Sequence, residues 1–111
     1  MVHELPERDW KYLRSIQKDL LNDLCLRINQ EAAGIVSSKT ESEHDKYLKL
    51  YRHIEDSNNI IAECFGNWSR SKLWLRLIYM CNHKLLSAEQ IMHLSEECRV
   101  RLEILYPNEC K

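Results

Sequence analysis

The chain has 111 residues, of which 44% are hydrophobic and 30% charged, with only two glycines and two prolines. This length holds one domain, residues 1–111, and compact β-proteins need turn residues about every 8 to 12 positions. The composition therefore excludes them and predicts an all-α fold. Sixteen basic against seventeen acidic residues leave a formal net charge of −1, which argues against a nucleic-acid partner because nucleic-acid-binding proteins carry a basic surplus.

The first helix is predicted over about residues 6–33. Pro6 suits the opening turn because its fixed φ matches a helix. Gly34 is the expected stop. Apolar residues between them recur at steps of three and four along one face; these are Trp10, Leu13, Ile16, Leu20, Leu24 and Ile28.

The second helix is predicted over about residues 41–83, and Thr40 and Glu43 have the spacing of a capping box at its start. A mainly apolar row recurs along it at alternating steps of four and three residues, which is the pattern of packed helices. This seam comprises Tyr47, Tyr51, Ile54, Asn58, Ile61, Phe65, Trp68, Lys72, Leu75 and Tyr79. Gly66 and Asn67 lie beside the seam, so we expect one long helix to continue through them, although an exposed glycine costs about 1 kcal/mol.

The third helix is predicted over about residues 87–105. Ser87 and Gln90 form a capping box at its start, and Pro107 ends it. The expected fold is thus a bundle of three helices with a long central helix.

Residues 73–81 are apolar on every side except at Arg76. A helix that is apolar all round is buried, and one short third helix gives this segment too little cover. We therefore predict a homodimer in which the rear halves of two long helices meet in a central four-helix bundle. If the chain turns at Gly66, a monomeric four-helix bundle is the alternative.

A basic and aromatic segment accompanies this apolar run and supplies the candidate binding residues. They are Trp68, Arg70, Lys72, Trp74, Arg76 and Tyr79. Basic residues among aromatic ones can contact a nucleic-acid backbone or a membrane surface. The charge balance of the whole chain favours neutralisation by the acidic last helix instead, so we interpret the segment as a protein interface near the dimer centre.

Arg76 and His83 lie two helical turns apart on one face, with six residues between them. The pair resembles the loose Arg-x4–6-His signature of HEPN-type ribonucleases, which are small all-α proteins that often dimerise around it. The resemblance covers these eight residues and implies that Arg76 and His83 act on an RNA phosphate without a metal. The polar residue that commonly follows the arginine is Leu77 here.

Metal and cofactor sites are not expected. The five cysteines include no C-x-x-C pair, which excludes a zinc knuckle and indicates reduced structural thiols. Glu41 and His44 form an E-x-x-H pair, but a di-iron bundle needs a second such pair. No transmembrane segment is predicted because the longest apolar run is shorter than about 20 residues, and a cytoplasmic location is expected because the N-terminus lacks the apolar core of a signal peptide.

Two further segments, ERDWKYLR at 7–14 and FGNWSRS at 65–71, resemble parts of small uncharacterised bacterial all-α proteins, which implies no defined activity. The leading hypothesis is a non-enzymatic helical protein that works by self-association and by binding another macromolecule, with an unknown protein as the expected partner. The alternatives are the HEPN-like ribonuclease, a peripheral membrane protein, and a bundle that holds a small apolar ligand. The cavity of that bundle would be lined by Tyr47, Ile61, Phe65 or Trp68.

Overall fold

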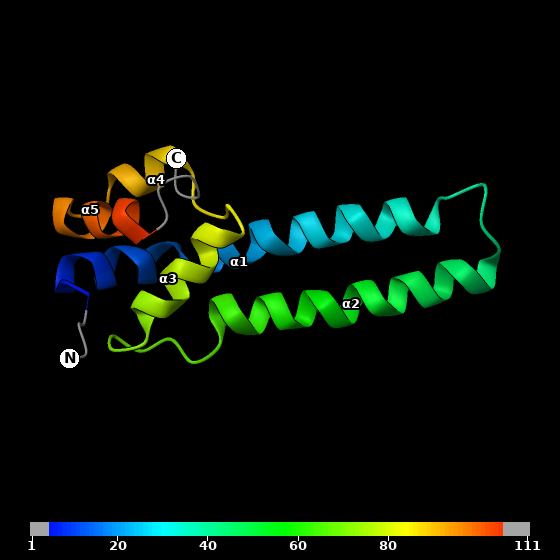
Figure 1. Cartoon of the computed structure of the whole chain (residues 1–111), viewed down its shortest axis with the longest axis horizontal. Helices are drawn as coiled ribbons and strands as arrows, with labels where there is room; N and C mark the ends of the chain where they lie inside the picture. Colours follow the sequence, from blue (N-terminus) through cyan, green and yellow to red (C-terminus); the bar gives the residue numbers. More distant parts are fainter. Residues whose placement is uncertain (1–4, 106–111) are drawn as a thin grey trace.

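The computed structural model describes residues 5–105, and all regular secondary structure within them is helical (Figure 1). The helices are α1 (Glu7–Val36), α2 (Glu43–Phe65), α3 (Leu73–Asn82), α4 (Ala88–Met92) and α5 (Glu96–Leu105). The prediction of an all-α fold is confirmed. The prediction of three helices is wrong, because both later helices are interrupted.

Helices α1 and α2 form a long antiparallel hairpin. Pro6 precedes the first turn of α1, as predicted, but α1 continues to Val36 and passes through Gly34. A Cβ added at Gly34 would meet no atom within 4 Å, so this glycine is an exposed helical residue and not a stop. The N-cap of α2 is Ser42, whose hydroxyl accepts a hydrogen bond from the Asp45 amide, and not the predicted Thr40.

The prediction of one continuous helix over residues 41–83 is wrong, because the helix ends at Gly66. Gly66 is extended, with φ −72° and ψ 131°, and Asn67 has a positive φ of 47°. Asparagine adopts this left-handed conformation more easily than most residues. The carbonyls exposed at the end of α2 gain side-chain donors, since the Trp68 indole donates to the Cys64 oxygen over 2.8 Å. The break is therefore stabilised by the residues that follow it.

The predicted helix 87–105 is divided into α4 and α5. The capping box at its start is confirmed, because the Ser87 hydroxyl accepts from the Gln90 amide and the Gln90 side chain accepts from the Ser87 amide. Ser95 interrupts the helix. Its amide and hydroxyl donate to the two carboxylate oxygens of Asp9 at 2.7 and 2.6 Å, and its hydroxyl accepts from the Cys98 amide. Asp9 is fully buried, so this contact ties α5 to the start of α1. Pro107 lies outside the described residues.

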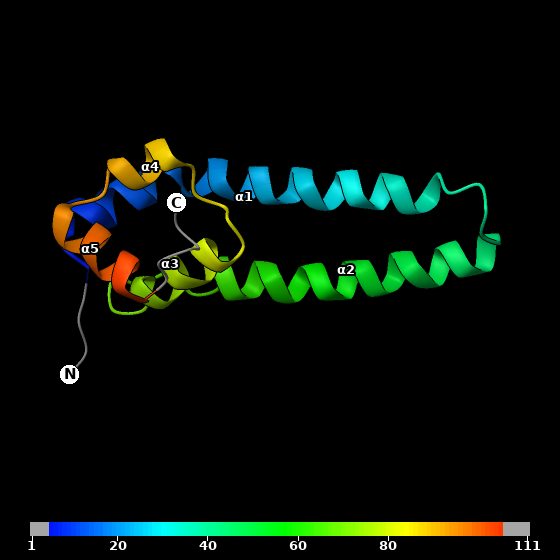
Figure 2. The same ribbon diagram turned by 45° about the horizontal axis from the view of Figure 1, so that its top comes forward.

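The core lies at one end of the hairpin. It joins the first half of α1 and the end of α2 to α3, α4 and α5, which together we call the head (Figure 2). Its most deeply buried side chains are Leu5, Leu13, Leu20, Cys64, Leu73, Leu77, Met80, Cys81, Leu94, Cys98 and Leu102. The rest of the hairpin projects from the head, which gives extents of 51 × 25 × 24 Å and a radius of gyration of 16.5 Å. A compact domain of about 100 residues has a radius of gyration of about 13 Å.

Two sequence predictions about packing need correction. The chain turns at Gly66, which was the condition for a monomeric four-helix bundle, but the turn produces a head and a projecting hairpin instead. One side of residues 73–81 is covered by their own chain, since Leu73, Leu77 and Met80 are fully buried, whereas Leu75 is 46% exposed. The expectation that all cysteines are reduced is also wrong for Cys81, which is disulfide-bonded.

Replacing Gly66 by alanine tests the break between α2 and α3. A Cβ at residue 66 would lie 2.6 Å from the Ala62 carbonyl oxygen, so Gly66→Ala is expected to lower the free energy of unfolding by about 1 to 3 kcal/mol. Gly34→Ala is the matched control and should raise it by up to about 1 kcal/mol. Urea unfolding measures both. A stabilising Gly66→Ala would mean that the helix continues through residue 66.

Candidate functional site

The predicted basic and aromatic site residues mainly contact other residues of the head. The Trp68 ring stacks on Phe65, with ring centroids 5.8 Å apart and an interplanar angle of 11°. The guanidinium of Arg101 lies 4.5 Å from the centroid of the Trp74 ring. Tyr79 is half-buried and packs against the core. These aromatic side chains therefore stabilise the fold.

The two predicted arginines contact backbone carbonyls. Arg70 donates through Nε to the Leu5 oxygen over 3.1 Å. Arg76 donates through Nη1 to the oxygens of Glu63 and Ala62, at 3.0 and 3.5 Å, and so caps the C-terminal end of α2. Lys72 precedes α3 and is exposed. The predicted site residues thus lie around the α2–α3 connection, and most of them contact their own chain.

Arg76 and His83 come together around one acidic residue. Arg76 contacts the Glu63 backbone, and His83 Nε2 lies 4.0 Å from the Glu63 Oε1 atom. The guanidinium of Arg76 is half-buried against two carbonyls, a position that suits helix capping more than contact with an RNA phosphate.

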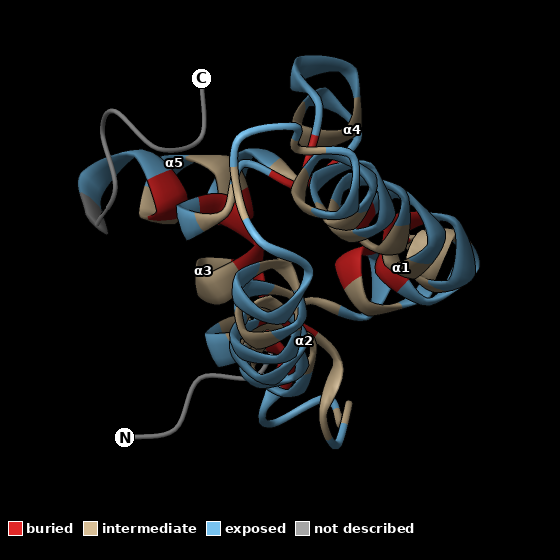
Figure 3. Cartoon of the chain, turned by 90° about the vertical axis from the view of Figure 1, so that its right-hand side faces the viewer, coloured by how far each residue is buried: buried red, intermediate tan, exposed pale blue. Residues whose placement is uncertain are grey.

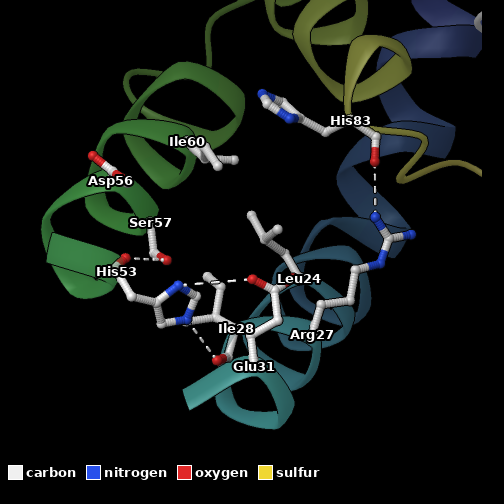
Figure 4. A pocket seen from close by; sticks show the side chains of 9 residues that line it. All are labelled: Leu24, Arg27, Ile28, Glu31, His53, Asp56, Ser57, Ile60 and His83. Atoms are coloured by element: carbon white, nitrogen blue, oxygen red, sulfur yellow. Dashed lines mark hydrogen bonds and ion pairs between the residues drawn. The ribbon is translucent and has the colours of Figure 1, made fainter. Parts of the chain in front are cut away.

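A pocket of about 360 Å³ separates α1 from α2 beside the head (Figure 4). It is lined by Leu24, Arg27, Ile28, Glu31, His53, Asp56, Ser57, Ile60 and His83. These are not the residues predicted to hold an apolar ligand. One weak signal for the pocket is present in the sequence, namely the polar residues His53 and Ser57, which are four residues apart and therefore share one face of α2.

The polar groups of this pocket hold elements together. His53 Nε2 lies 2.9 Å from the Ile28 oxygen, and its Nδ1 lies 3.7 Å from a carboxylate oxygen of Glu31. Arg27 donates to the backbone oxygens of His83 and Lys84 at 2.8 and 2.7 Å, which caps the end of α3. The pocket is thus a structural junction between the hairpin and the head.

Nucleophilic cysteine chemistry is disfavoured at two buried thiols. Burial raises the pKa of Cys64 to about 11 and that of Cys98 to about 12. Because the thiolate is the reactive form, both side chains stay protonated and inert near neutral pH. Cys25 is also a free thiol, but it is only half-buried.

The side of the hairpin that faces away from the head carries a different kind of surface. Helix α2 turns its Leu50, His53, Ser57, Ile60 and Cys64 face toward α1 and leaves most of the predicted seam outside. Tyr47 is 63% exposed, Tyr51 55% and Ile54 49%. The prediction that these seam residues pack against the chain's own helices is wrong for this half of α2.

Helix α1 contributes a matching stripe to the same side. Val36, which is 51% exposed, lines a shallow recess of about 210 Å³ together with Tyr47, Leu50 and the charged residues Glu43 and Lys46. At about 100° per residue, positions at steps of three and four before Val36 share its side of the helix. We define the hairpin face as both stripes together, namely Asn22, Cys25, Asn29, Ala32 and Val36 of α1 with Tyr47, Tyr51, Ile54, Asn58, Ile61 and Phe65 of α2.

The eleven residues of the hairpin face are uncharged, but charged residues lie at both ends of the face, with Glu43 beside Val36 and Tyr47, and Lys18 beside Asn22 and Cys25. The opposite side of the hairpin carries more charged residues. That side presents Asp23, Arg27, Lys49, Arg52, Asp56 and Glu63. In Figure 3, which looks along the hairpin from its tip, the buried positions gather toward α3 and α5. The head therefore packs on the charged side only at Arg27 and Glu63, while Asp23, Lys49, Arg52 and Asp56 stay exposed.

Comparisons of the chain with protein-family models, with curated proteins and with solved structures find no match. The resemblances inferred from the sequence therefore stay predictions. Among residues 5–105, no helix is long and apolar enough to cross a bilayer, and no three His, Cys, Asp or Glu side chains cluster as metal ligands do. The cytoplasmic location also stays a prediction.

The structural role of Arg76 can be separated from a binding role by stability. Arg76→Ala removes a charged donor from two carbonyls at the end of α2 and is expected to cost about 1.5 to 3 kcal/mol of unfolding free energy. Lys72→Ala, at an exposed position nearby, should change it by less than about 0.5 kcal/mol. Urea unfolding of both variants makes the comparison. Equal stabilities would show that Arg76 is not a structural residue.

Proposed function

We propose that the protein is a non-enzymatic interaction protein that binds another protein surface through its hairpin face. The observation that carries this proposal is the exposure of Tyr47, Tyr51, Ile54 and Val36, each about half exposed or more, on an uncharged surface. Single exposed apolar residues are ordinary on proteins, but a continuous patch rimmed by polar residues marks an interaction site.

Physical considerations favour a protein partner for this face. Tyrosine is enriched and charged residues are depleted at the centres of protein interfaces. A peripheral membrane helix would carry a basic row beside its apolar stripe, whereas Lys49 and Arg52 of α2 alternate with Asp45, Glu55 and Asp56. The apolar stripe also lies on two paired helices, which present it in a fixed shape and limit the entropy lost on binding.

A photoreactive residue tests the proposal in extracts of the cells that produce the protein. Positions 54 and 52 are both exposed and lie about 200° apart around α2, so they sample opposite sides of the hairpin. A benzophenone amino acid in place of Ile54 should give covalent protein adducts above the mass of the chain. The same group in place of Arg52 should give few. Equal yields from the two positions, or no adduct from position 54, would contradict the proposal.

A metal-independent ribonuclease is the second candidate. The observation that favours it is the convergence of Arg76 and His83 on Glu63, although Arg76 already donates to carbonyls. Incubation of single-stranded RNA with the purified chain in EDTA tests it. We expect no cleavage above that of a His83→Ala preparation. Cleavage that survives EDTA and is lost in His83→Ala would establish this activity in place of our expectation.

A further inference from the structure

We infer that the partner of the hairpin face is a second copy of this chain, so that two hairpins close face to face into a four-helix bundle. This inference rests on the proposed function, because it names the occupant of the same surface. The heads lie on the opposite side of each hairpin and stay clear of the contact.

The first argument is the shape of the exposed surface. The stripe from Tyr47 to Phe65 spans about 27 Å of α2, and two adjacent helices are about 20 Å wide. Its last two members, Ile61 and Phe65, are half-buried against the head. A single docked helix would cover about half of that width. An occupant two helices wide covers all of it, and the chain's own hairpin has that width.

The surface area that two copies would bury is also consistent with a specific dimer. The face measures roughly 500 Å² in projection, so a face-to-face pair buries on the order of 1,000 Å² in total, which reaches the lower range of specific protein interfaces. The corresponding stripe of α1 lies beside that of α2, so rotation by 180° about the hairpin axis places α1 of one copy opposite α2 of the other. Neighbouring helices are then antiparallel, as in four-helix bundles.

The third argument is chemical complementarity. The partner of an uncharged surface must itself lack charge at the contact, because an unpaired charge buried there would be costly. The hairpin face meets this condition against itself. The polar residues on it, Asn22, Asn29 and Asn58, are neutral and can donate and accept hydrogen bonds. The net charge of −1 gives two copies little reason to repel each other.

Light scattering of the purified full chain between about 5 and 500 μM, a range that spans weak to moderate dimer affinities, tests the inference. The expected mass rises to twice the 13.3 kDa of one chain. Ile54→Glu should raise the dissociation constant at least tenfold, and Asn59→Glu, which adds the same charge on another side of α2, should leave it within about twofold. Because residue 54 is exposed in the single chain, the variant should fold, and circular dichroism checks this. Tyr51→Glu is the second variant.

The native thiol of Cys25 provides an independent readout on the same face. Its labelling by a maleimide, followed by peptide mass spectrometry, should slow as the concentration of the wild-type chain rises. In Ile54→Glu it should stay constant. Together with the doubled mass, this result would place the contact on the hairpin face.

Other outcomes would overturn the inference in distinguishable ways. A single-chain mass throughout, together with adducts from the photoreactive group at position 54 in extracts, would reject a second copy and leave the proposed function standing. A dimer that Ile54→Glu does not weaken would place the contact elsewhere and reject it as well. Co-sedimentation with anionic vesicles that is lost in Ile54→Glu would identify a membrane as the occupant. No dimer and no adduct at position 54 would reject both proposals.

Discussion

The structure depends on one constraint, which is that the hairpin is longer than the core that stabilises it. The core at one end buries Leu73, Leu77, Met80, Leu94 and Leu102 of the segment from α3 to α5, while Leu75, Met92, Val100 and Ile104 of that segment stay exposed. The buried Asp9 carboxylate fixes α5 against α1 through both polar atoms of Ser95. A buried carboxylate is tolerated because these hydrogen bonds replace its lost hydration. Beyond the head, α1 and α2 have only each other, so the sides of each helix that do not face the other lie in solvent.

Helical periodicity predicted much of this fold but not the places where helices end. The all-α class, the stripe of Leu13, Leu20 and Leu24, and the capping box at Ser87 follow from patterns that span a few turns. The break at Gly66 does not follow from such patterns. Helix α3 is so apolar that the seam can be continued through it in many registers. Asn67 has a positive φ, and the carbonyls at the end of α2 are satisfied by the side chains of Trp68 and Arg76, which lie beyond the break.

The site shows the same limit of sequence patterns. The alternation of Tyr47, Tyr51 and Ile54 indicates a helix that packs, but a pattern does not state which surface packs on it. The structure assigns the side facing α1 to Leu50, His53 and Ser57, which were less conspicuous because two of them are polar. The aromatic and basic residues near α3 were predicted to form a binding surface. In the structure, Trp68 and Arg76 donate hydrogen bonds to the backbone of their own chain.

The central claim is that the hairpin face, and not the segment around α3, is where this protein meets a second chain. Dilution of the isotopically labelled full chain, followed by NMR, measures this most directly. We predict concentration-dependent shifts at Val36, Tyr47, Tyr51 and Ile54, with the indole signals of Trp68 and Trp74 unchanged. Shifts confined to the two indoles and their neighbours, or none at any concentration, would contradict it.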